Sequence, residues 1–422
     1  MIDNQELNLA FEFVQYTDRH IFLTGKAGTG KTTFLHSLKE RSPKRMVVVA
    51  PTGVAAINAG GVTIHSFFQL PFGPILPGRL TEHSQNGEAN VIIHKFSKKK
   101  INIIRSIDLL VIDEVSMVRA DLLDGIDQVL RRFRNKNQAF GGVQLLMIGD
   151  LQQLPPVVKQ DEWQLLKTHY SSMFFFSSHA FQKSNPVTIE LKHIYRQQEE
   201  HFIRILNEIR DDRLTPDSIE ALNKRYIPGF RPGADDGYIM LTTHNAKARR
   251  INDEELGKLT TPALTIEAEV WGNFPEYSYP ADPRLTLKEG ARVMFIKNDR
   301  SPEKRYFNGK TGRVAEIGED HVFVICEGDA DPIEVEKEMW ENIRYSIHAV
   351  SKQIQEEVVG TYSQIPLRLA WAITIHKSQG LTFEKAVIDA QAAFAHGQTY
   401  VALSRCRTLE GLVISTPITE QG

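Results

Sequence analysis

Short apolar runs alternate with amphipathic segments along the first part of the chain. Leu7, Phe11 and Val14 recur at helical spacing within residues 4–15, which predicts an opening helix. Four strand-length apolar runs follow, at 21–23, 46–49, 109–112 and 145–148. Between the last two runs, the apolar residues of 120–133 fall on one face of a predicted helix. Short β-branched runs joined by helices predict an α/β domain, with a parallel sheet covered on both faces.

The pattern changes twice in the second part of the chain. A second α/β block is expected to open at the apolar run 187–191, and to continue through a helix at 202–209 and a strand at 238–242. From about residue 260 to 342, apolar and polar residues alternate with a period of two, and Gly and Asp stand at the turns. This alternation predicts a small antiparallel barrel inserted into the second block. The α/β pattern then resumes at 367–375, 386–388 and 412–414.

Composition limits the class of protein. A length of 422 residues suggests two or three domains, and 41% hydrophobic with 24% charged residues excludes a disordered chain. Two cysteines, Cys326 and Cys406, exclude a disulfide framework and a zinc cluster of thiolates, and the apolar runs are too short to span a membrane. Because Asp3 and Glu6 stand where a signal peptide would be cationic, we expect a cytoplasmic, nucleoid-associated protein without a membrane partner. The net charge of −2 gives no overall attraction to nucleic acid, so such a contact must come from a local groove.

One motif carries specific chemistry. Residues 25–32 match G-x-x-x-x-G-K-[ST] in full, after a predicted strand and before a predicted helix. Its glycines let the backbone curl around phosphates with the N–H groups pointing inward. Lys31 would neutralise the β- and γ-phosphates of ATP, and the Thr32 hydroxyl would ligate Mg²⁺. The alternative, a glycine-rich connector that fits by chance, is disfavoured because both flanks agree with the motif.

Polar residues with possible catalytic roles follow the next two predicted strands. Asp113 and Glu114 end the apolar run 109–112, where Asp113 can hold Mg²⁺ and Glu114 can deprotonate the attacking water. A solvated acidic strand end is the structural alternative. After the run 145–148, Gln153 can hydrogen-bond the γ-phosphate and report its loss. These residues together predict an ATPase.

The ordered set of motifs resembles a superfamily 1 helicase, of the petite-integration-frequency (Pif) branch of the 5′-to-3′ RecD-like class and of the minimal bacterial or phage type. The matching segments run from Gly25 to Arg407. Besides the phosphate loop they are 50–56, 63–67, 112–117, 140–150, the signature helix 121–133, 191–197, 370–382 and 400–407.

The resemblance implies a fold of two RecA-like parallel-sheet domains in tandem. The first would cover 1–180, with a wedge insertion at 64–100, and the second 181–258 and 345–422, with an SH3-like β-barrel insertion at 259–344. By itself the Pro- and Gly-rich stretch 71–90, followed by lysines, is typical of a solvated loop. The resemblance instead favours a wedge that splits the duplex.

The resemblance also assigns residues to the nucleotide. Arg196 and Arg405 would act as arginine fingers supplied in cis, although an isolated arginine more often pairs with a surface carboxylate. The expected ATP contacts are Gly25, Ala27, Gly28, Thr29, Gly30, Lys31, Thr32, Thr33 and Gly380. The adenine-reading residue is Gln5 or Asn8, because spacing alone does not separate them.

A DNA groove is implied by the remaining motifs. Its expected contacts are Pro51, Thr52, Gly53, His65, Phe67, His244, His376, Lys377 and Ser378. Each histidine suits a structural hydrogen bond equally well, and Asp389 can be a plain strand-end acid. Hydroxyls, imidazoles and backbone N–H groups are suited to phosphate contacts that slip along a strand.

The expected function is ATP-driven 5′-to-3′ translocation by a monomer on single-stranded DNA. Duplexes, forks and G-quadruplexes would be disrupted in repair, recombination or telomere maintenance. A 3′-to-5′ helicase of the same superfamily is one alternative. Another is an ATP-regulated module that binds and remodels single-stranded DNA, but Glu114, Gln153 and both arginines would then be unnecessary. An RNA track stays open because a 2′-OH sensor leaves no motif.

Overall fold

The computed structural model divides the chain into two compact units. The structure describes residues 4–77, 80–81, 91–92, 96–197, 199–233, 236–299, 301, 303–318, 321–326, 328–348, 354–389 and 397–418. Unit 1 consists of Met1–Leu151, Pro155–Ile194 and Asn342–Val359. Unit 2 consists of Gln152–Leu154, Tyr195–Glu341 and Gly360–Gly422. Within the described residues, no helix has the length and apolar character needed to cross a membrane.

Unit 1 is built on a six-stranded parallel sheet with the order β3-β2-β6-β7-β1-β8. Its strands are β1 (Ile21–Gly25), β2 (Met46–Ala50), β3 (Val62–Thr63), β6 (Leu109–Ile112), β7 (Gln144–Ile148) and β8 (Val187–Leu191). The three strands β1, β6 and β7 are buried along their whole length, and this explains why their sequences are almost continuously apolar. The predicted α/β class is confirmed.

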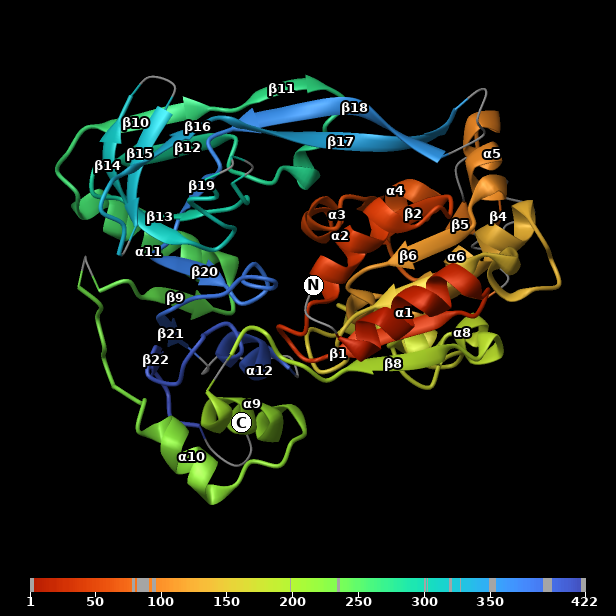
Figure 1. Cartoon of the computed structure of the whole chain (residues 1–422), viewed down its shortest axis with the longest axis horizontal. Helices are drawn as coiled ribbons and strands as arrows, with labels where there is room; N and C mark the ends of the chain where they lie inside the picture. The colour runs from red at the N-terminus through yellow and green to blue at the C-terminus, as the bar shows by residue number, and fades with distance from the viewer. Residues whose placement is uncertain are drawn as a thin grey trace. The chain divides into compact units, whose positions relative to one another are not determined.

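Helices cover both faces of this sheet (Figure 1). One face packs on α1 (Gln5–Tyr16) and α2 (Lys31–Arg41). The other packs on α4 (Ile64–Phe68), α5 (Lys98–Ser106) and α6 (Ala120–Phe133). Unit 1 also contains α3 (Gly53–Asn58), α7 (Gln160–Leu166), α8 (His179–Ser184) and the short strands β4 (Leu80–Thr81) and β5 (Val91–Ile92). Much of the predicted wedge, including residues 82–90 and 93–95, lies outside the described residues.

Two predicted boundaries are wrong. Strand β8, expected to open the second block, pairs in parallel with β1 at the edge of the first sheet, with Ile21 opposite Val187. Unit 1 therefore reaches Ile194 and does not end at residue 180. The insertion likewise does not end at residue 344, because β19 (Leu367–Leu369) pairs antiparallel with β13 (Arg292–Phe295) of the insert. An apolar run identifies a strand but not the sheet that the strand joins.

Unit 2 combines a parallel sheet with the antiparallel insert. The parallel sheet has the order β20-β9-β21-β22, formed by β20 (Ala372–Thr374), β9 (Ile239–Thr242), β21 (Ala386–Ile388) and β22 (Leu412–Ile414). Its helices are α9 (Glu200–Arg210), α10 (Pro216–Asn223), α11 (Asn245–Lys258) and α12 (Gln398–Leu403). The insert has a five-stranded antiparallel sheet, β16-β15-β14-β13-β19, over its own apolar core. Its further strands are β14 (Thr311–Ile317), β15 (His321–Cys326), β16 (Ile333–Glu336) and the pair β10 (Ala263–Glu267) and β12 (Arg284–Lys288).

Two long strands, β17 (Glu338–Ile347) and β18 (Ile354–Gln364), form a three-stranded sheet with β11 (Glu269–Gly272) (Figure 1). Their residues Asn342–Val359 belong to unit 1. Tyr345 is 3% exposed, and its hydroxyl accepts a hydrogen bond from the Val48 amide at 3.1 Å. Its ring lies edge-on to Phe67. This segment of late sequence is therefore part of the core of unit 1.

Candidate functional site

The phosphate loop joins β1 to α2. Gly25, Gly28 and Gly30 have φ angles of 154°, 81° and 87°, in the region that favours glycine. A Cβ on Gly25 would lie 2.9 Å from both the Leu191 Cβ and the Leu191 carbonyl oxygen. The N-cap of α2 is Gly30, so its first N–H groups face a loop without a capping side chain, as an anion site requires.

The Lys31 side chain contacts the backbone of the phosphate loop. Its Nζ donates hydrogen bonds to the carbonyl oxygens of Gly25 at 2.6 Å and Lys26 at 2.9 Å. The buried Thr29 hydroxyl donates to the same Lys26 oxygen at 2.9 Å. The Lys31 ammonium is thus held in place by carbonyl oxygens of the phosphate loop itself. Thr32 and Thr33 are exposed at the start of α2.

Two acids follow β6. The Asp113 amide donates to the Val49 carbonyl at 2.9 Å, and Glu114 has a left-handed backbone with φ of 50°. Burial and, to a lesser extent, the Glu114 carboxylate raise the pKa of Asp113 to about 7, against the opposing charge of Lys31. Lys31 and Asp113 are therefore electrostatic neighbours.

The residues fit a magnesium ion that is shared with phosphates. Asp113 and Thr32 offer a carboxylate and a hydroxyl, the hard oxygen donors that Mg²⁺ prefers. Within the part of the chain that the structure describes, no group of three or more His, Cys, Asp or Glu side chains forms a self-sufficient metal cage. Mg²⁺ typically takes one or two protein ligands and completes its coordination with water and nucleotide phosphates.

Gln153 lies in the segment Gln152–Leu154, which belongs to unit 2. It is 8% exposed, and its Oε1 accepts a hydrogen bond from Gln379 Nε2 at 3.4 Å. Gly397, with φ of 82°, packs so closely that a Cβ there would lie 2.5 Å from the Gln153 carbonyl oxygen. The sequence assigned no role to Gln379, although it stands within the motif 370–382.

Two guanidinium groups converge in unit 2. Arg405 is 1% exposed and donates from Nε to the Val401 carbonyl at 2.8 Å. Arg196 donates to the Ser404 carbonyl at 3.3 Å and the Gly380 carbonyl at 3.5 Å. Burial and the adjacent Arg405 charge lower the pKa of Arg196 to about 9. Carbonyl oxygens thus hold the two neighbouring guanidinium groups within unit 2.

The adenine candidates lie on the first turn of α1. Asn4 caps this helix by accepting a hydrogen bond from the Leu7 amide at 3.0 Å, and both Gln5 and Asn8 are exposed. The assignment of adenine reading to one of them stays a prediction.

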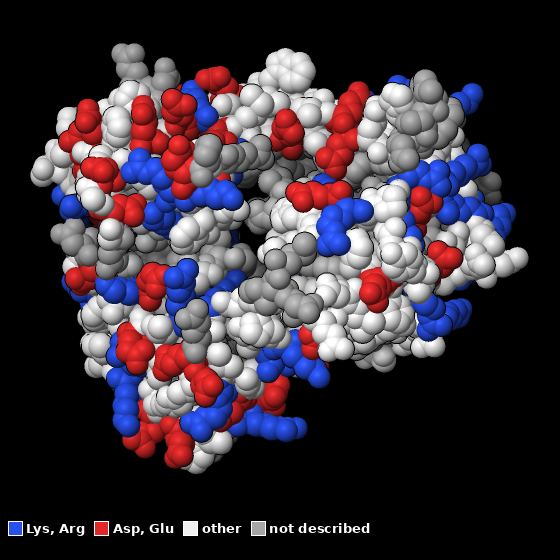
Figure 2. Space-filling view, viewed as in Figure 1, with Lys and Arg blue, Asp and Glu red and all other residues white. Residues whose placement is uncertain are grey.

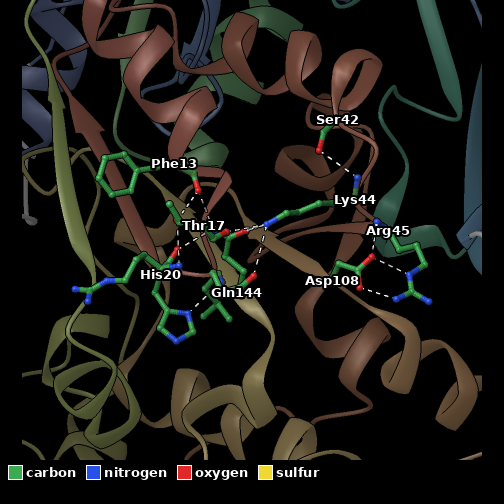
Figure 3. Close-up of polar contacts among 11 residues, drawn as sticks. Phe13, Thr17, His20, Ser42, Lys44, Arg45, Asp108 and Gln144 are labelled. Atoms are coloured by element: carbon green, nitrogen blue, oxygen red, sulfur yellow. Dashed lines mark hydrogen bonds and ion pairs between the residues drawn. The ribbon is translucent and has the colours of Figure 1, made fainter. Parts of the chain in front are cut away.

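The opposite end of α1 is fixed by a polar network (Figure 3). Gln144, 2% exposed, donates to the carbonyls of Phe13 at 3.3 Å and Arg19 at 2.9 Å. Lys44 Nζ donates to Gln144 Oε1 at 2.7 Å and to the Thr17 carbonyl at 2.9 Å. Burial lowers the pKa of Lys44. These contacts hold the connection between α1 and β1 against the start of β7.

Two of the predicted DNA contacts have buried side chains, and their assignment stays a prediction. Phe67 is 1% exposed within the core of unit 1, because α4 turns this ring toward the sheet. Ser378 is fully buried, and its hydroxyl donates to the Ile375 carbonyl at 2.7 Å. Neither side chain is accessible to a strand.

The other predicted DNA contacts in unit 1 have structural partners. The Thr52 hydroxyl caps α3 by accepting from the Ala55 amide at 3.2 Å. His65 Nδ1 lies 3.2 Å from the Leu70 carbonyl, and its ring lies 4.6 Å from the exposed ring of Phe72. Burial lowers the pKa of His65. Pro51 and Gly53 are half-buried after β2.

Those in unit 2 lie after the parallel strands β9 and β20. His244 is exposed and its Nδ1 lies 2.7 Å from the Thr243 hydroxyl. Lys377 is exposed, and His376 is half-buried, with a pKa lowered by burial. Asp389 is buried and forms an ion pair with Lys247, so it is more than a solvated strand end.

The fold and the site together define a phosphate-loop nucleotide-binding protein with two parallel sheets. A family model described as PIF1-like helicase matches residues 5–218. The chain belongs to this family, which confirms the resemblance seen in its motifs.

Individual relatives agree with this assignment. The chain is 34% identical to human ATP-dependent DNA helicase PIF1 over 406 residues, and the match covers 93% of this chain and 57% of the relative. The chain thus spans little more than half of the human protein. ATP-dependent DNA helicase Pif1 of Campylobacter jejuni is 32% identical, with 96% of this chain and 89% of the relative covered.

Solved structures of a Bacteroides Pif1 are similar over the whole chain. The complex with ADP-AlF4 shares 43% identity and a TM-score of 0.91, covering 100% of this chain and 94% of that one. The same protein bound to single-stranded DNA gives 42% identity and a TM-score of 0.68 at the same coverage.

Proposed function

We propose that the protein is an ATP-dependent DNA helicase that moves 5′ to 3′ along single-stranded DNA. The observation that carries this proposal is the preorganised phosphate loop, with Lys31 inside it and Asp113 as its electrostatic neighbour. The curated relatives are named ATP-dependent DNA helicases, and the Bacteroides protein has been solved with single-stranded DNA. Both arginine fingers belong to the same chain, so a monomer would suffice for hydrolysis.

Each site residue then has a chemical task. The loop N–H groups and Lys31 bind the β- and γ-phosphates, and Glu114 accepts a proton from the attacking water. Arg196 and Arg405 stabilise the charge that spreads over the transferring oxygens. Thr32 and Asp113 would hold Mg²⁺, which when bound would supply positive charge that neutralises the phosphates. Gln153 reports the presence of the γ-phosphate.

We expect the strand to contact exposed groups at the ends of the parallel strands. The proposed contacts are Pro51, Thr52, Gly53, His65, His244, His376 and Lys377. Binding through phosphates without base readout would be nearly independent of sequence and sensitive to salt.

The substitution Lys31→Ala tests the catalytic assignment. Loss of the ammonium removes the main cation of the loop, so ATP hydrolysis should fall by roughly a hundredfold or more, as for other transition-state donors. The measurement is DNA-stimulated phosphate release at saturating Mg²⁺, with Lys183→Ala as an exposed control in unit 1. Hydrolysis at the normal rate by the Lys31→Ala protein would refute the assignment.

Polarity is tested by strand displacement with ATP and Mg²⁺ on partial duplexes that carry a 5′ or a 3′ overhang. We expect displacement from the 5′ overhang alone. Displacement from the 3′ overhang alone would overturn the direction. Hydrolysis stimulated by DNA without displacement would identify a remodelling module.

A further inference from the structure

The surface formed by α5 and the end of α6 is rich in positive charge. In residues 96–106 and 128–138 every charged residue is basic, although the whole chain has a net charge of −2. These residues are Lys98, Lys99, Lys100, Arg105, Arg131, Arg132, Arg134 and Lys136. We call them the α5–α6 basic surface. Figure 2 shows Lys and Arg side chains gathered around α5.

Direct contacts bring the two segments together into one surface. At the start of α5, the rings of Phe96 and Phe133 lie 5.0 Å apart. At its end, Arg105 Nε donates to the Phe133 carbonyl at 3.3 Å, and Arg134 donates to the Ile104 carbonyl at 3.0 Å. Both ends of α5 therefore meet the last turn of α6 and the residues after it.

Neighbouring acids neutralise only part of this charge. Asp127 pairs with Arg131 at 2.8 Å, and Asp108 pairs with Arg45 at 2.6 Å and also interacts with the charge of Arg134. Lys98, Lys99, Arg132 and Lys136 are exposed to solvent, whereas Lys100 lies against the buried Phe67 ring. A group of exposed cations of this kind is the electrostatic footprint of a polyanion site.

Helix electrostatics explain only part of the pattern. Arg131 and Arg132 lie in the last turn of α6, where cations favour the helix dipole. Lys98 and Lys99 lie in the first turn of α5, directly after its N-cap Ser97, where cations oppose the dipole. Lysines at this unfavourable place indicate a role other than helix stability.

Among the described residues of α5 and the end of α6, no exposed aromatic ring offers the platform that an unstacked base needs. Phe96 is buried and Phe133 is half-buried, so these rings serve packing between the helices. Exposed cations without stacking rings are suited to the regular phosphate backbone of a duplex, not to a single strand.

We propose that the α5–α6 basic surface binds the phosphates of duplex DNA. This inference rests on the proposed function and adds a second DNA contact, for the double-stranded part of the substrate. Lys98 and Lys99 also fall within residues 64–100, which the sequence predicts to form the wedge. A duplex held there would lie beside the point of strand separation.

The test compares two triple variants of the full chain. The first is Lys98→Gln, Lys99→Gln and Lys136→Gln, which removes three exposed charges from the surface. The matched control is Lys159→Gln, Lys167→Gln and Lys183→Gln, three exposed lysines elsewhere in unit 1. Fluorescence anisotropy measures binding to a blunt 20-base-pair duplex and to a short single strand, over a range of salt concentrations.

We expect the first variant to bind the duplex about tenfold or more weakly, with the slope of log K against log salt reduced by about 3, since each lost phosphate contact lowers it by about 1. Single-strand affinity and single-strand-stimulated hydrolysis should stay within twofold of wild type. Equal loss in the control variant, or duplex binding unchanged in the first, would overturn the inference. If DNA did not stimulate ATP hydrolysis by the wild-type protein, the proposed function would be refuted instead. The duplex-binding result would still decide whether the α5–α6 basic surface binds DNA.

Discussion

Lys100 places its ammonium 3.7 Å from the centroid of the buried Phe67 ring. Burial and the nearby Arg344 lower the pKa of Lys100 from its ordinary 10.5 to about 7. Between pH 7 and 10.5 the unfolded chain then binds more protons than the folded one, so the free energy of unfolding rises with pH through this window. The penalty of burying the charge is fully present below pH 7.

Lys100→Met should therefore stabilise unit 1, most strongly at pH 7 and below, and the gain should vanish near pH 10.5. Thermal unfolding at pH 6, 8 and 10 measures this difference. Lys99→Met, at an exposed neighbour, serves as the control and should show little dependence on pH. A gain for Lys100→Met that is constant with pH would contradict the assigned pKa.

Gly397 supports the segment that carries Gln153. Alanine at this position would need φ near 82° and would press on the Gln152 and Gln153 carbonyls. We expect Gly397→Ala to reduce stimulated ATP hydrolysis by roughly tenfold through displaced Gln153, since small misplacements of catalytic groups are costly. The affinity for ATP should change little. Steady-state kinetics separate the two effects, and Gly229→Ala, at an open position that also has positive φ, controls for backbone strain.

At the scale of elements, α6 organises unit 1 through buried acids. Asp124 accepts hydrogen bonds from the Tyr170 hydroxyl at 3.0 Å, the Ser178 hydroxyl at 2.7 Å and the amides of His179 and Ala180. It thereby anchors the start of α8 to the middle of α6. Asp121 similarly accepts from the Ile75 amide at 2.8 Å.

Asp124→Ala would leave these buried donors without their acceptor. We expect the free energy of unfolding to fall by about 3–5 kcal/mol, the range for removing one partner of a buried charged network. Asp124→Asn, which keeps the shape and one acceptor, should cost less. Denaturant unfolding measures both, and Asp161→Ala on the exposed side of α7 should cost little.

The sequence predicts elements better than it predicts their partners. The strip of apolar residues in 120–133 predicts α6 with the bounds that the structure has. The burial of Asp121 and Asp124 was not predicted, because the apolar pattern of one helix does not show what packs against its other residues. The burial of Phe67 was not predicted either, since its position within a motif does not show which way a short helix turns its side chains. The phosphate loop was predictable because its chemistry is local in sequence.

At the scale of the whole molecule, unit 1 is assembled from distant parts of the chain. Tyr345 and its neighbours Ile343, Ile347 and Ile354 pack on the core formed by α4, α5 and α6. Lys39 also pairs with Glu356 at 3.0 Å. A chain ending at Ile194 would expose this part of the core.

We expect such a truncated chain to be destabilised and to bind a hydrophobic dye. Thermal unfolding and dye fluorescence measure this. Fusion of residues 342–359 to the truncated chain through a flexible linker should restore stability. A truncated chain as stable as its fused counterpart would show that Tyr345 and its neighbours contribute little.

The contribution of Asn342–Val359 to unit 1 sets an order of events during synthesis. After Ile194 has been translated, about 150 further residues must follow before Tyr345 can reach Val48. At the usual elongation rate of ~5–20 residues per second, this interval is on the order of 10 s. During this interval the amino-terminal sheet of the nascent chain has an uncovered apolar patch. Slow codons or chaperone binding in the same interval would therefore affect the yield of folded protein.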